Sequence, residues 1–431
     1  MGNNEKDSHI TTTDNNQVIN LGCRFNQYES SSIKQILDEN ESQNTIVINT
    51  CAVTAEAEKK CRQAVKKIAK ENKDKRIIVT GCAAQINPDQ FKAIKGVSLI
   101  VGNDKKLQSE SYQENKQEEV VVKVGDVMSQ KVVDNFIVKD FTEKSRAYIQ
   151  IQNGCDHRCT FCIIPFGRGN SRSANYQDIE KQISLLLERG YNEIILTGVD
   201  LTSYQEPQEN FKLGTLCKKL LHNLPKLMRL KLSSVDIAEI DEDLFDLIIN
   251  EQKFAPYIHL SLQSGDNLIL KRMKRRHTAE QVYEFCNKVL QKRLVCFGAD
   301  IICGFPTETD EMFENSLKIV KNVPITLVHA FTFSPRVGTP AARMPQVERA
   351  IAKQRTRKLI DLGDENLIKF MENLIGTEQI ITIENDHRGR TETFIKVAFE
   401  RNENLIVGSL IKCRITKIIY KEESLLHGEI M

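Results

Sequence analysis

The chain has 431 residues, of which 40% are hydrophobic and 27% are charged, so it is long enough to bury several cores and is not a disordered polypeptide. Its 60 lysine and arginine residues nearly balance its 58 aspartate and glutamate residues, and a net charge of +2 does not by itself indicate a nucleic-acid partner. No run of eighteen apolar residues occurs, which excludes a membrane-spanning helix. Twelve cysteines without a secretion signal predict a reducing, cytoplasmic compartment in which thiols bind metals or fill cores.

The polar segment 1–16 predicts a mobile tail ahead of a first domain at 17–103. In that domain, apolar runs without alternation are separated by helical stretches, which predicts an open parallel α/β sheet. The expected strands are 18–21, 45–49, 76–80 and 98–102. Cys23, Cys51 and Cys82 each fall within two residues of a strand end. Because such ends meet at one edge of a parallel sheet, we expect the three thiols to converge, although each alone could be a small buried hydrophobe.

Residues 104–146 are irregular and highly charged, and they predict a linker with a hairpin-like piece at 118–127. Six further cysteines lie in apolar segments with helical or strand periodicity. We expect these six to pack in cores rather than to bind metals: Cys61, Cys217, Cys286, Cys296, Cys303 and Cys413.

A strand–helix rhythm returns at 147–337 and belongs to a second domain expected at 147–375. Its six expected strands are 147–151, 193–199, 228–235, 257–263, 298–303 and 327–333. Repeated βα units of this number predict a partial (β/α)6 barrel, with the functional residues at the C-terminal ends of the strands.

A cysteine loop with the spacing C-x3-C-x2-C follows the first of these strands and contains Cys155, Cys159 and Cys162. A disulfide would leave one of the three unpaired. A closed zinc site needs a fourth ligand, for which only His157 is near in sequence. Cysteine loops with short gaps are the usual ligands of iron–sulfur clusters, and three cysteines on a 4Fe–4S cluster leave one iron open to a small molecule.

This spacing, with Phe161 directly before the last cysteine, resembles the cluster loop of radical S-adenosylmethionine enzymes. The resemblance implies that the open iron binds the amino and carboxylate groups of S-adenosylmethionine, whose cleavage gives a 5′-deoxyadenosyl radical. It also implies that Phe161 and residues after the barrel strands line the cofactor pocket, namely Gly198, Asp200, Ser261, Gln263 and Gly304.

The contexts LGCRFNQYES, NTCAVT and TGCAAQ resemble the N-terminal domain of the methylthiotransferase family within this superfamily. In that family the three matching cysteines hold an auxiliary 4Fe–4S cluster, so the resemblance implies a second cluster on Cys23, Cys51 and Cys82. In the family scheme, one S-adenosylmethionine methylates a sulfur on the auxiliary cluster and a second one is cleaved at the cysteine loop.

The segment 376–431 contains short alternating strands and predicts a small β-barrel of the oligonucleotide-binding type. It resembles the TRAM domain, which implies RNA binding, but its eight basic and nine acidic residues give no basic excess. The side chains expected to contact RNA are Arg388, Arg390, Lys396, Arg414, Lys417 and Lys421, with Phe394 and Tyr420 for stacking on bases.

The family resemblance implies a tRNA methylthiotransferase that replaces the C–H bond at C2 of an adenine by C–S–CH3. NQYES after Cys23 and CAVT at Cys51 resemble the branch that acts on N6-threonylcarbamoyladenosine beside the anticodon. The tRNA anticodon loop is then the expected macromolecular partner, together with a reductant that the sequence does not identify. Three alternatives stay open: the branch acting on isopentenyladenosine, the branch acting on an aspartate of a ribosomal protein, and a non-catalytic RNA-binding protein stabilised by zinc.

Overall fold

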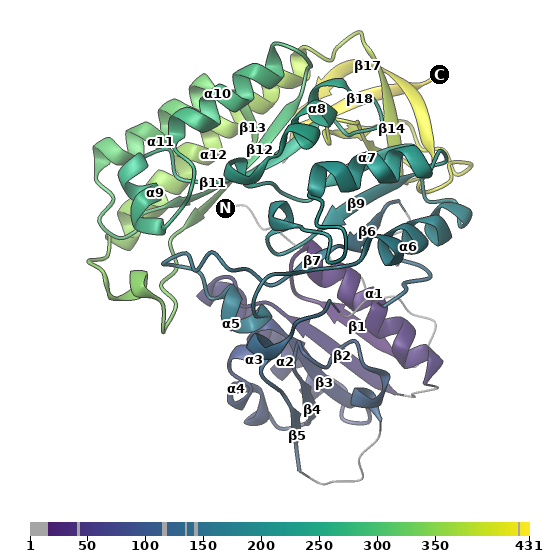
Figure 1. Cartoon of the computed structure of the whole chain (residues 1–431), viewed down its shortest axis with the longest axis vertical. Coiled ribbons are helices and arrows are strands. Elements are labelled where there is room, and N and C mark those ends of the chain that lie inside the picture. Colours follow the sequence, from purple (N-terminus) through teal and green to yellow (C-terminus); the bar gives the residue numbers. More distant parts are fainter. Residues whose placement is uncertain (1–15, 41–43, 114–118, 134–135, 142–144, 421–422) are drawn as a thin grey trace.

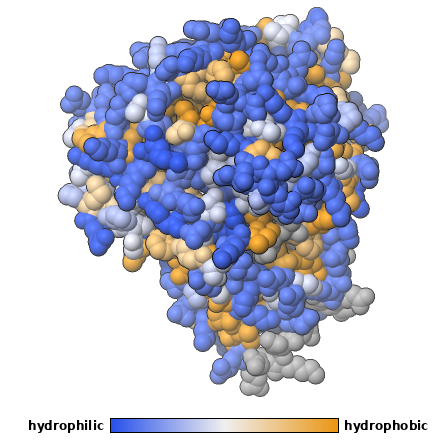
Figure 2. All heavy atoms as spheres, in the orientation of Figure 1, coloured by the Kyte–Doolittle hydropathy of each residue, from blue (hydrophilic) through white to orange (hydrophobic). Residues whose placement is uncertain are grey.

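The computed structural model describes residues 16–40, 44–113, 119–133, 136–141, 145–420 and 423–431. The expected tail, apart from Asn16, and the expected RNA contact Lys421 lie outside these ranges. Figure 1 shows an α/β domain at the bottom, a larger barrel domain above it, and a small β-barrel at the upper right. The face drawn in Figure 2 is largely hydrophilic, with its hydrophobic residues in small groups. No helix in the described ranges is long and apolar enough to cross a membrane.

The N-terminal domain is built on one parallel sheet with the order β1-β2-β3-β4-β5. Its strands are β1 (Gln17–Asn20), β2 (Thr45–Thr50), β3 (Arg76–Gly81), β4 (Val97–Val101) and β5 (Val121–Lys123). Its helices are α1 (Arg24–Glu39), α2 (Ala55–Glu71), α3 (Cys82–Ile86) and α4 (Asp89–Lys92). All six residues of β2 are buried, as expected for a central strand covered on both faces, so the predicted open parallel α/β domain is confirmed.

Strand β5 corrects one expectation. The apolar run around Val121 was expected to form a hairpin within a linker, but it pairs in parallel with β4 and adds a fifth strand to the N-terminal sheet. The hairpin expectation is wrong because the apolar run predicts a strand without identifying its partner, which here lies about twenty residues earlier in the chain.

The central domain contains six parallel strands in two sheets, β6-β9-β10 and β11-β12-β13. Two parallel bridges, Leu230 with Phe254 and Val235 with Leu260, join the sheets into one curved wall. The strands are β6 (Ala147–Gln150), β9 (Glu193–Thr197), β10 (Arg229–Leu232), β11 (Tyr257–Gln263), β12 (Cys296–Cys303) and β13 (Ile325–Thr332). The predicted partial (β/α)6 barrel is therefore confirmed.

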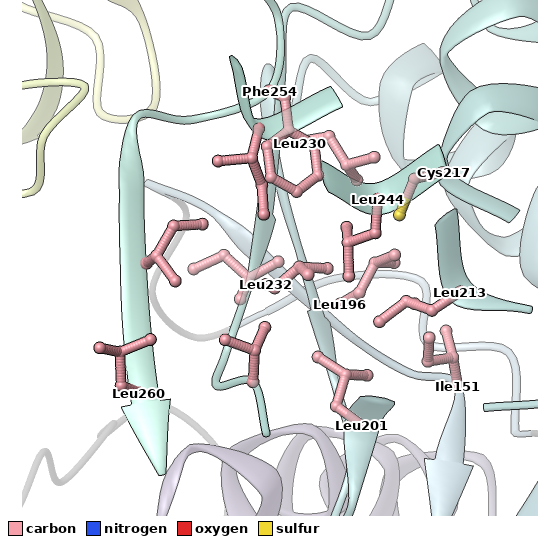
Figure 3. Close-up of a cluster of buried hydrophobic side chains, with 14 of the residues drawn as sticks. Ile151, Leu196, Leu201, Leu213, Cys217, Leu230, Leu232, Leu244, Phe254 and Leu260 are labelled. Atoms are coloured by element: carbon pink, nitrogen blue, oxygen red, sulfur yellow. The ribbon is translucent and has the colours of Figure 1, made fainter. Parts of the chain in front are cut away.

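Helices cover the outer face of this wall: α6 (Tyr176–Glu188), α7 (Leu213–Asn223), α8 (Glu242–Asn250), α9 (Asn267–Met273), α10 (Ala279–Leu290), α11 (Asp310–Asn322) and α12 (Arg349–Glu372). Figure 3 shows part of the large apolar core between strands and helices, in which Cys217 lies beside Leu244. The buried position of Cys217 agrees with its expected role in packing.

The C-terminal segment forms a closed barrel with the strand order β14-β15-β16-β18-β17, as the alternating pattern predicts. Its strands are β14 (Glu378–Asn385), β15 (Arg388–Arg390), β16 (Lys396–Ala398), β17 (Leu410–Ile419) and β18 (Leu425–Ile430). The barrel lies against the N-terminal ends of the central strands, where the Arg229 guanidinium donates to the Thr382 hydroxyl at 2.7 Å.

Phe394 corrects a second expectation, since its ring is not available for stacking on RNA. It is 8% exposed, and its ring centroid lies 5.1 Å from that of Tyr257 on β11. The ring therefore belongs to the interface between the small barrel and the central domain. Tyr420, the other aromatic residue expected to stack, is 64% exposed.

Candidate active site

The cysteine loop is closed at its base by two short antiparallel strands, β7 (Gln152–Asn153) and β8 (Arg172–Ser173), directly above the C-terminal end of β6. The helix α5 (Ile164–Arg168) follows the last cysteine. Gly154 has φ +74°, and a Cβ there would lie 1.9 Å from a backbone oxygen, so only glycine fits where the loop begins. The three thiols, Cys155, Cys159 and Cys162, are all half-buried, and we call them the loop site.

Two anchors hold the loop site against the ends of β11 and β12. The Thr160 amide donates to the Met273 carbonyl at 3.2 Å, at the end of α9. The Phe161 ring packs edge-on against Phe305, with 6.3 Å between ring centroids. Phe161 therefore packs against the barrel, while the cysteines on either side of it stay partly exposed.

His157 lies within the loop but is held by carboxylates. Its Nε2 is 2.7 Å from Asp200 Oδ2 and 3.6 Å from Glu239 Oε2. These hydrogen bonds raise the pKa of His157 to about 10, so the imidazole carries a proton at neutral pH. The Nε2 atom of His157 is thus turned toward carboxylates, and Cys155, His157 and Asp200 lie close enough together that they could share a metal ion.

Asp200 itself touches the loop site, because its Oδ2 accepts from the Cys155 thiol at 3.5 Å. A cavity of about 710 Å³ opens beside this contact and is lined by Asp200, His157, Glu239 and Arg276, among others. The structure thus brings one expected cofactor-pocket residue next to a cysteine, in a cavity with room for a small polar molecule.

Arg275 brings a positive charge to the other side of the loop site. Its Nη1 is 3.8 Å from Cys159 Sγ, and its Nη2 donates to Asp236 at 2.7 Å and to the Ser261 carbonyl at 3.0 Å. Burial raises the pKa of Asp236, but the hydrogen bond from His277 and the charge of Arg275 outweigh burial and lower the pKa to about 2. The ionised carboxylate fixes the guanidinium, which in turn links the expected residue Ser261 to the cysteine loop.

The other expected pocket residues lie at the ends of the barrel strands. Gly198 follows β9 and packs closely on Gln152, since a Cβ added at Gly198 would lie 2.8 Å from the side-chain amide oxygen of Gln152. Gln263 ends β11 with φ +66°. Gly304 follows β12 with φ +71°, and a Cβ there would lie 2.3 Å from Ala352 on α12. All three therefore lie on the strand-end side of the barrel, and their contact with a cofactor stays a prediction.

The second group of cysteines, Cys23, Cys51 and Cys82, which we call the N-terminal site, comes from the ends of β1, β2 and β3. Cys23 precedes α1, Cys51 follows β2, and Cys82 is the first residue of α3. Burial, followed by the neighbouring thiols of Cys23 and Cys82, raises the pKa of Cys51 to about 12. The three cysteines therefore come from neighbouring loops at one edge of the sheet, and their binding of a metal cluster stays a prediction.

Arg168, the last residue of α5, connects the two cysteine sites. Its Nε donates to Cys82 Sγ at 3.0 Å, and its guanidinium also binds Glu29, which pairs with Lys106 at 2.5 Å. The side chains of Glu29 and Lys106 are each 1% exposed. An arginine from the loop that carries Cys162 is therefore buried against a cysteine of the N-terminal site.

Both cysteine sites share one arrangement, in which an arginine N–H points at a cysteine sulfur and a buried carboxylate holds the arginine. Cationic N–H groups directed at sulfur suit anionic thiolate clusters. Sequence reasoning singled out neither arginine for this role, although Arg168 stands between two glycines in the loop sequence. The buried carboxylates Glu29 and Asp236 gave no sequence signal, because acidic residues in helices and loops are usually exposed.

Comparison with known proteins agrees with this geometry. The Radical SAM superfamily matches residues 149–320, and uncharacterized protein family UPF0004 matches residues 15–102. A relative from Rickettsia prowazekii, threonylcarbamoyladenosine tRNA methylthiotransferase MtaB, is 45% identical over 93% of this chain and 95% of its own. The chain belongs to the radical SAM methylthiotransferase family. It is therefore an enzyme of this family, and a 4Fe–4S cluster with S-adenosylmethionine is the cofactor pair that the family implies.

Other methylthiotransferases cover the chain in the same way. The MtaB protein of Aquifex aeolicus is 35% identical over 92% of this chain and 98% of its own. A tRNA-2-methylthio-N(6)-dimethylallyladenosine synthase of Ehrlichia chaffeensis is 30% identical over 88% of this chain and 89% of its own. Among solved structures, the radical S-adenosylmethionine methyltransferase TsrM of Kitasatospora setae superposes with a TM-score of 0.52 at 13% identity, covering 74% of this chain and 67% of that one, which supports the fold.

Proposed function

We propose that this enzyme methylthiolates C2 of N6-threonylcarbamoyladenosine beside the anticodon of tRNA, with a separate 4Fe–4S cluster at each cysteine site. The observation that carries the proposal is the pair of three-cysteine sites, which Arg168 connects because it follows Cys162 in the chain and donates to Cys82 Sγ. The chain is also similar to the Rickettsia protein over nearly the whole length of both. Relatives named for threonylcarbamoyladenosine reach 45% identity, whereas the dimethylallyladenosine synthases of Ehrlichia canis and Buchnera aphidicola are 31% identical, which favours the first substrate.

In this proposal the loop site holds a cluster through Cys155, Cys159 and Cys162. A cluster with S-adenosylmethionine, when bound, supplies one-electron cleavage of the sulfonium and hence a carbon radical that can attack an unactivated C–H bond. The Asp200 carboxylate beside Cys155 is suited to accept hydrogen bonds from the amino group of S-adenosylmethionine. Arg275 compensates the negative charge of the thiolates from the opposite side.

The N-terminal site would hold the second cluster through Cys23, Cys51 and Cys82, with one coordination position left for the inserted sulfur. Arg168 compensates charge here as Arg275 does at the loop site. Because α5, which follows Cys162, packs directly on α3, which begins at Cys82, the two sites are held at a fixed separation. The substrate base must reach both sites, which an unstacked anticodon-loop nucleotide can do.

The test uses the full chain, reconstituted anaerobically with iron and sulfide and supplied with a chemical reductant, S-adenosylmethionine and tRNA that carries N6-threonylcarbamoyladenosine. Mass spectrometry of the digested nucleosides is expected to detect the 2-methylthio derivative with the wild type and with the control Cys217→Ala, but not with Cys159→Ala. Product formed only from isopentenyladenosine tRNA, or full activity of Cys159→Ala, would contradict the proposal.

A further inference from the structure

The edge strand β13 presents one of its faces to the interior of the central barrel. Side chains alternate along a strand, so Leu327, His329, Phe331 and, just beyond the strand, Phe333 share a face. The opposite face, represented by Val328, packs against the outer helix α12, where a Cβ added at Gly363 would lie 2.7 Å from Val328 Cβ. The face that contains His329 and Phe331 therefore points inward.

Both ends of this face are fixed. At the upper end, Phe333 packs on Phe305 with 5.5 Å between centroids, and Phe305 packs on Phe161 of the cysteine loop. At the lower end, Leu327 packs against the apolar cluster that contains Phe394 of the small barrel. A two-residue step along a strand is about 7 Å, so Phe331 lies roughly one step below the loop contacts.

Phe331 and His329 are exposed although they lie inside the barrel. The ring of Phe331 is 46% exposed and the side chain of His329 is 47% exposed. An exposed aromatic ring on an inward face, one strand step from the Phe333 contact, offers a stacking platform for a nucleobase.

His329 is held in place by a chain of polar side chains on the neighbouring strands. Its Nδ1 is 3.4 Å from Asp300 Oδ1, which is also 3.2 Å from His259 Nε2. The chain ends at the Tyr257 hydroxyl, 3.0 Å from His259 Nδ1. Burial alone would raise the pKa of Asp300, but the two histidines hold it well below its usual range, so Asp300 is a carboxylate that accepts from both rings.

With Nδ1 of His329 turned to Asp300, its second ring nitrogen, Nε2, has no hydrogen-bond partner among the described residues. The Asp300 carboxylate orients the ring as a buried acid orients a histidine in many polar sites. A polar atom fixed beside an aromatic platform is suited to recognise a base that carries a hydrogen-bonding substituent.

We propose that Phe331 and His329 form the subsite for the modified base, in which the ring stacks on Phe331 and a polar N6 substituent hydrogen-bonds to His329 Nε2. Asp300 and His259 are positioning residues that act through His329. The inference rests on the proposed function and adds how the enzyme selects its substrate. With Nδ1–H donated to Asp300, Nε2 of His329 is an acceptor, so the N–H and hydroxyl donors of a threonylcarbamoyl group can pair with it. An apolar isopentenyl group would leave Nε2 of His329 desolvated and unpaired.

The experiment compares the full, reconstituted chain on three anticodon stem–loop RNAs that differ only in the adenosine beside the anticodon: threonylcarbamoylated, isopentenylated or unmodified. The measured quantity is kcat/KM for methylthiolation, separated into KM and kcat. His329→Leu removes the hydrogen bond, and His329→Gln retains a hydrogen-bonding group. The matched controls are His222→Leu on α7 and Tyr283→Leu on α10, because both of these side chains are exposed on outer helices.

We expect His329→Leu to lower the preference for the threonylcarbamoyl RNA over the isopentenyl RNA about 10-fold or more, chiefly through KM. His329→Gln should recover part of this preference, Phe331→Leu should raise KM for all three RNAs, and both controls should match the wild type. An unchanged preference in His329→Leu overturns the subsite while leaving the proposed function intact. A wild type that does not prefer the threonylcarbamoyl RNA overturns the proposed function itself.

A competing role for His259, Asp300 and His329 is to hold a divalent metal, since two histidines and a carboxylate are a common ligand set. Metal analysis of the purified chain decides this. One equivalent of zinc, manganese or iron beyond the cysteine-bound iron, lost in both His329→Leu and Asp300→Asn, would overturn the subsite. We expect no such equivalent, and metal content in both variants equal to that of the wild type.

Discussion

Replacing Arg168 by methionine should loosen the N-terminal domain, because this guanidinium is the connection between α5 and the buried carboxylate of Glu29. Arg168 is 2% exposed, donates to Glu29 and Cys82, and stacks over the Phe25 ring at 4.5 Å. Removing one partner of a buried ion pair costs about 3–5 kcal/mol. Lys106 still pairs with Glu29 in the variant, which places the expected loss near the lower end, at about 3 kcal/mol.

Native-state hydrogen exchange read by mass spectrometry measures this loss within the domain. A loss of about 3 kcal/mol should speed exchange of β2 and β3 amides about 100-fold, while the C-terminal barrel exchanges as in the wild type. Lys34→Met on α1 is the control, because its pair with Asp38 is partly exposed and worth about 0.3–0.5 kcal/mol. Equal exchange in Arg168→Met and Lys34→Met would refute the reasoning.

Three further expectations follow from other parts of the molecule. Phe394→Ala should cost about 3–5 kcal/mol and release the small barrel to limited proteolysis, whereas the exposed Tyr420→Ala should change stability by less than about 0.5 kcal/mol. Asp236 has its pKa lowered to about 2 in the folded chain, against about 3.9 in the unfolded chain, so its ionised carboxylate adds to the free energy of unfolding above about pH 4. This contribution of about 2 kcal/mol is lost as the pH falls from about 4 to 2. Acid titration of the metal-free chain should show the loss in the wild type and not in Asp236→Asn. Cys61→Ser should keep the wild-type iron content even though Cys61 Sγ lies 3.4 Å from the Cys51 amide, and a loss of iron would make it a ligand.

The convergence of cysteines at the N-terminal site was predictable because it depends on topology alone. Three strands read from apolar runs end before Cys23, Cys51 and Cys82, and parallel strands place such ends at one edge. The six barrel strands were predictable for a similar reason, since each is an apolar run between helical stretches. Local sequence is therefore sufficient to predict strands and their ends where the same strand–helix pattern repeats along the chain.

Features that depend on distant partners could not be predicted in this way. Phe394 lies in the turn between β15 and β16 with φ +69°, and its ring is buried against Tyr257, which lies 137 positions earlier in the chain. The pairing of Arg168 with Glu29 joins two domains across 139 positions. His329 gave no signal, because the carboxylate that orients it comes from the neighbouring strand β12. In each case a single contact between domains or strands gives the side chain its role.

The most direct test of the account is the iron and sulfide content of the anaerobically reconstituted chain, measured for the wild type and for two triple cysteine-to-alanine variants, one at the loop site and one at the N-terminal site. Two clusters predict about eight irons per chain in the wild type and about four in each variant. About four irons in the wild type, unchanged when the cysteines of the N-terminal site are removed, would contradict the two-cluster account. Stoichiometric zinc in place of iron would contradict the radical chemistry at both sites.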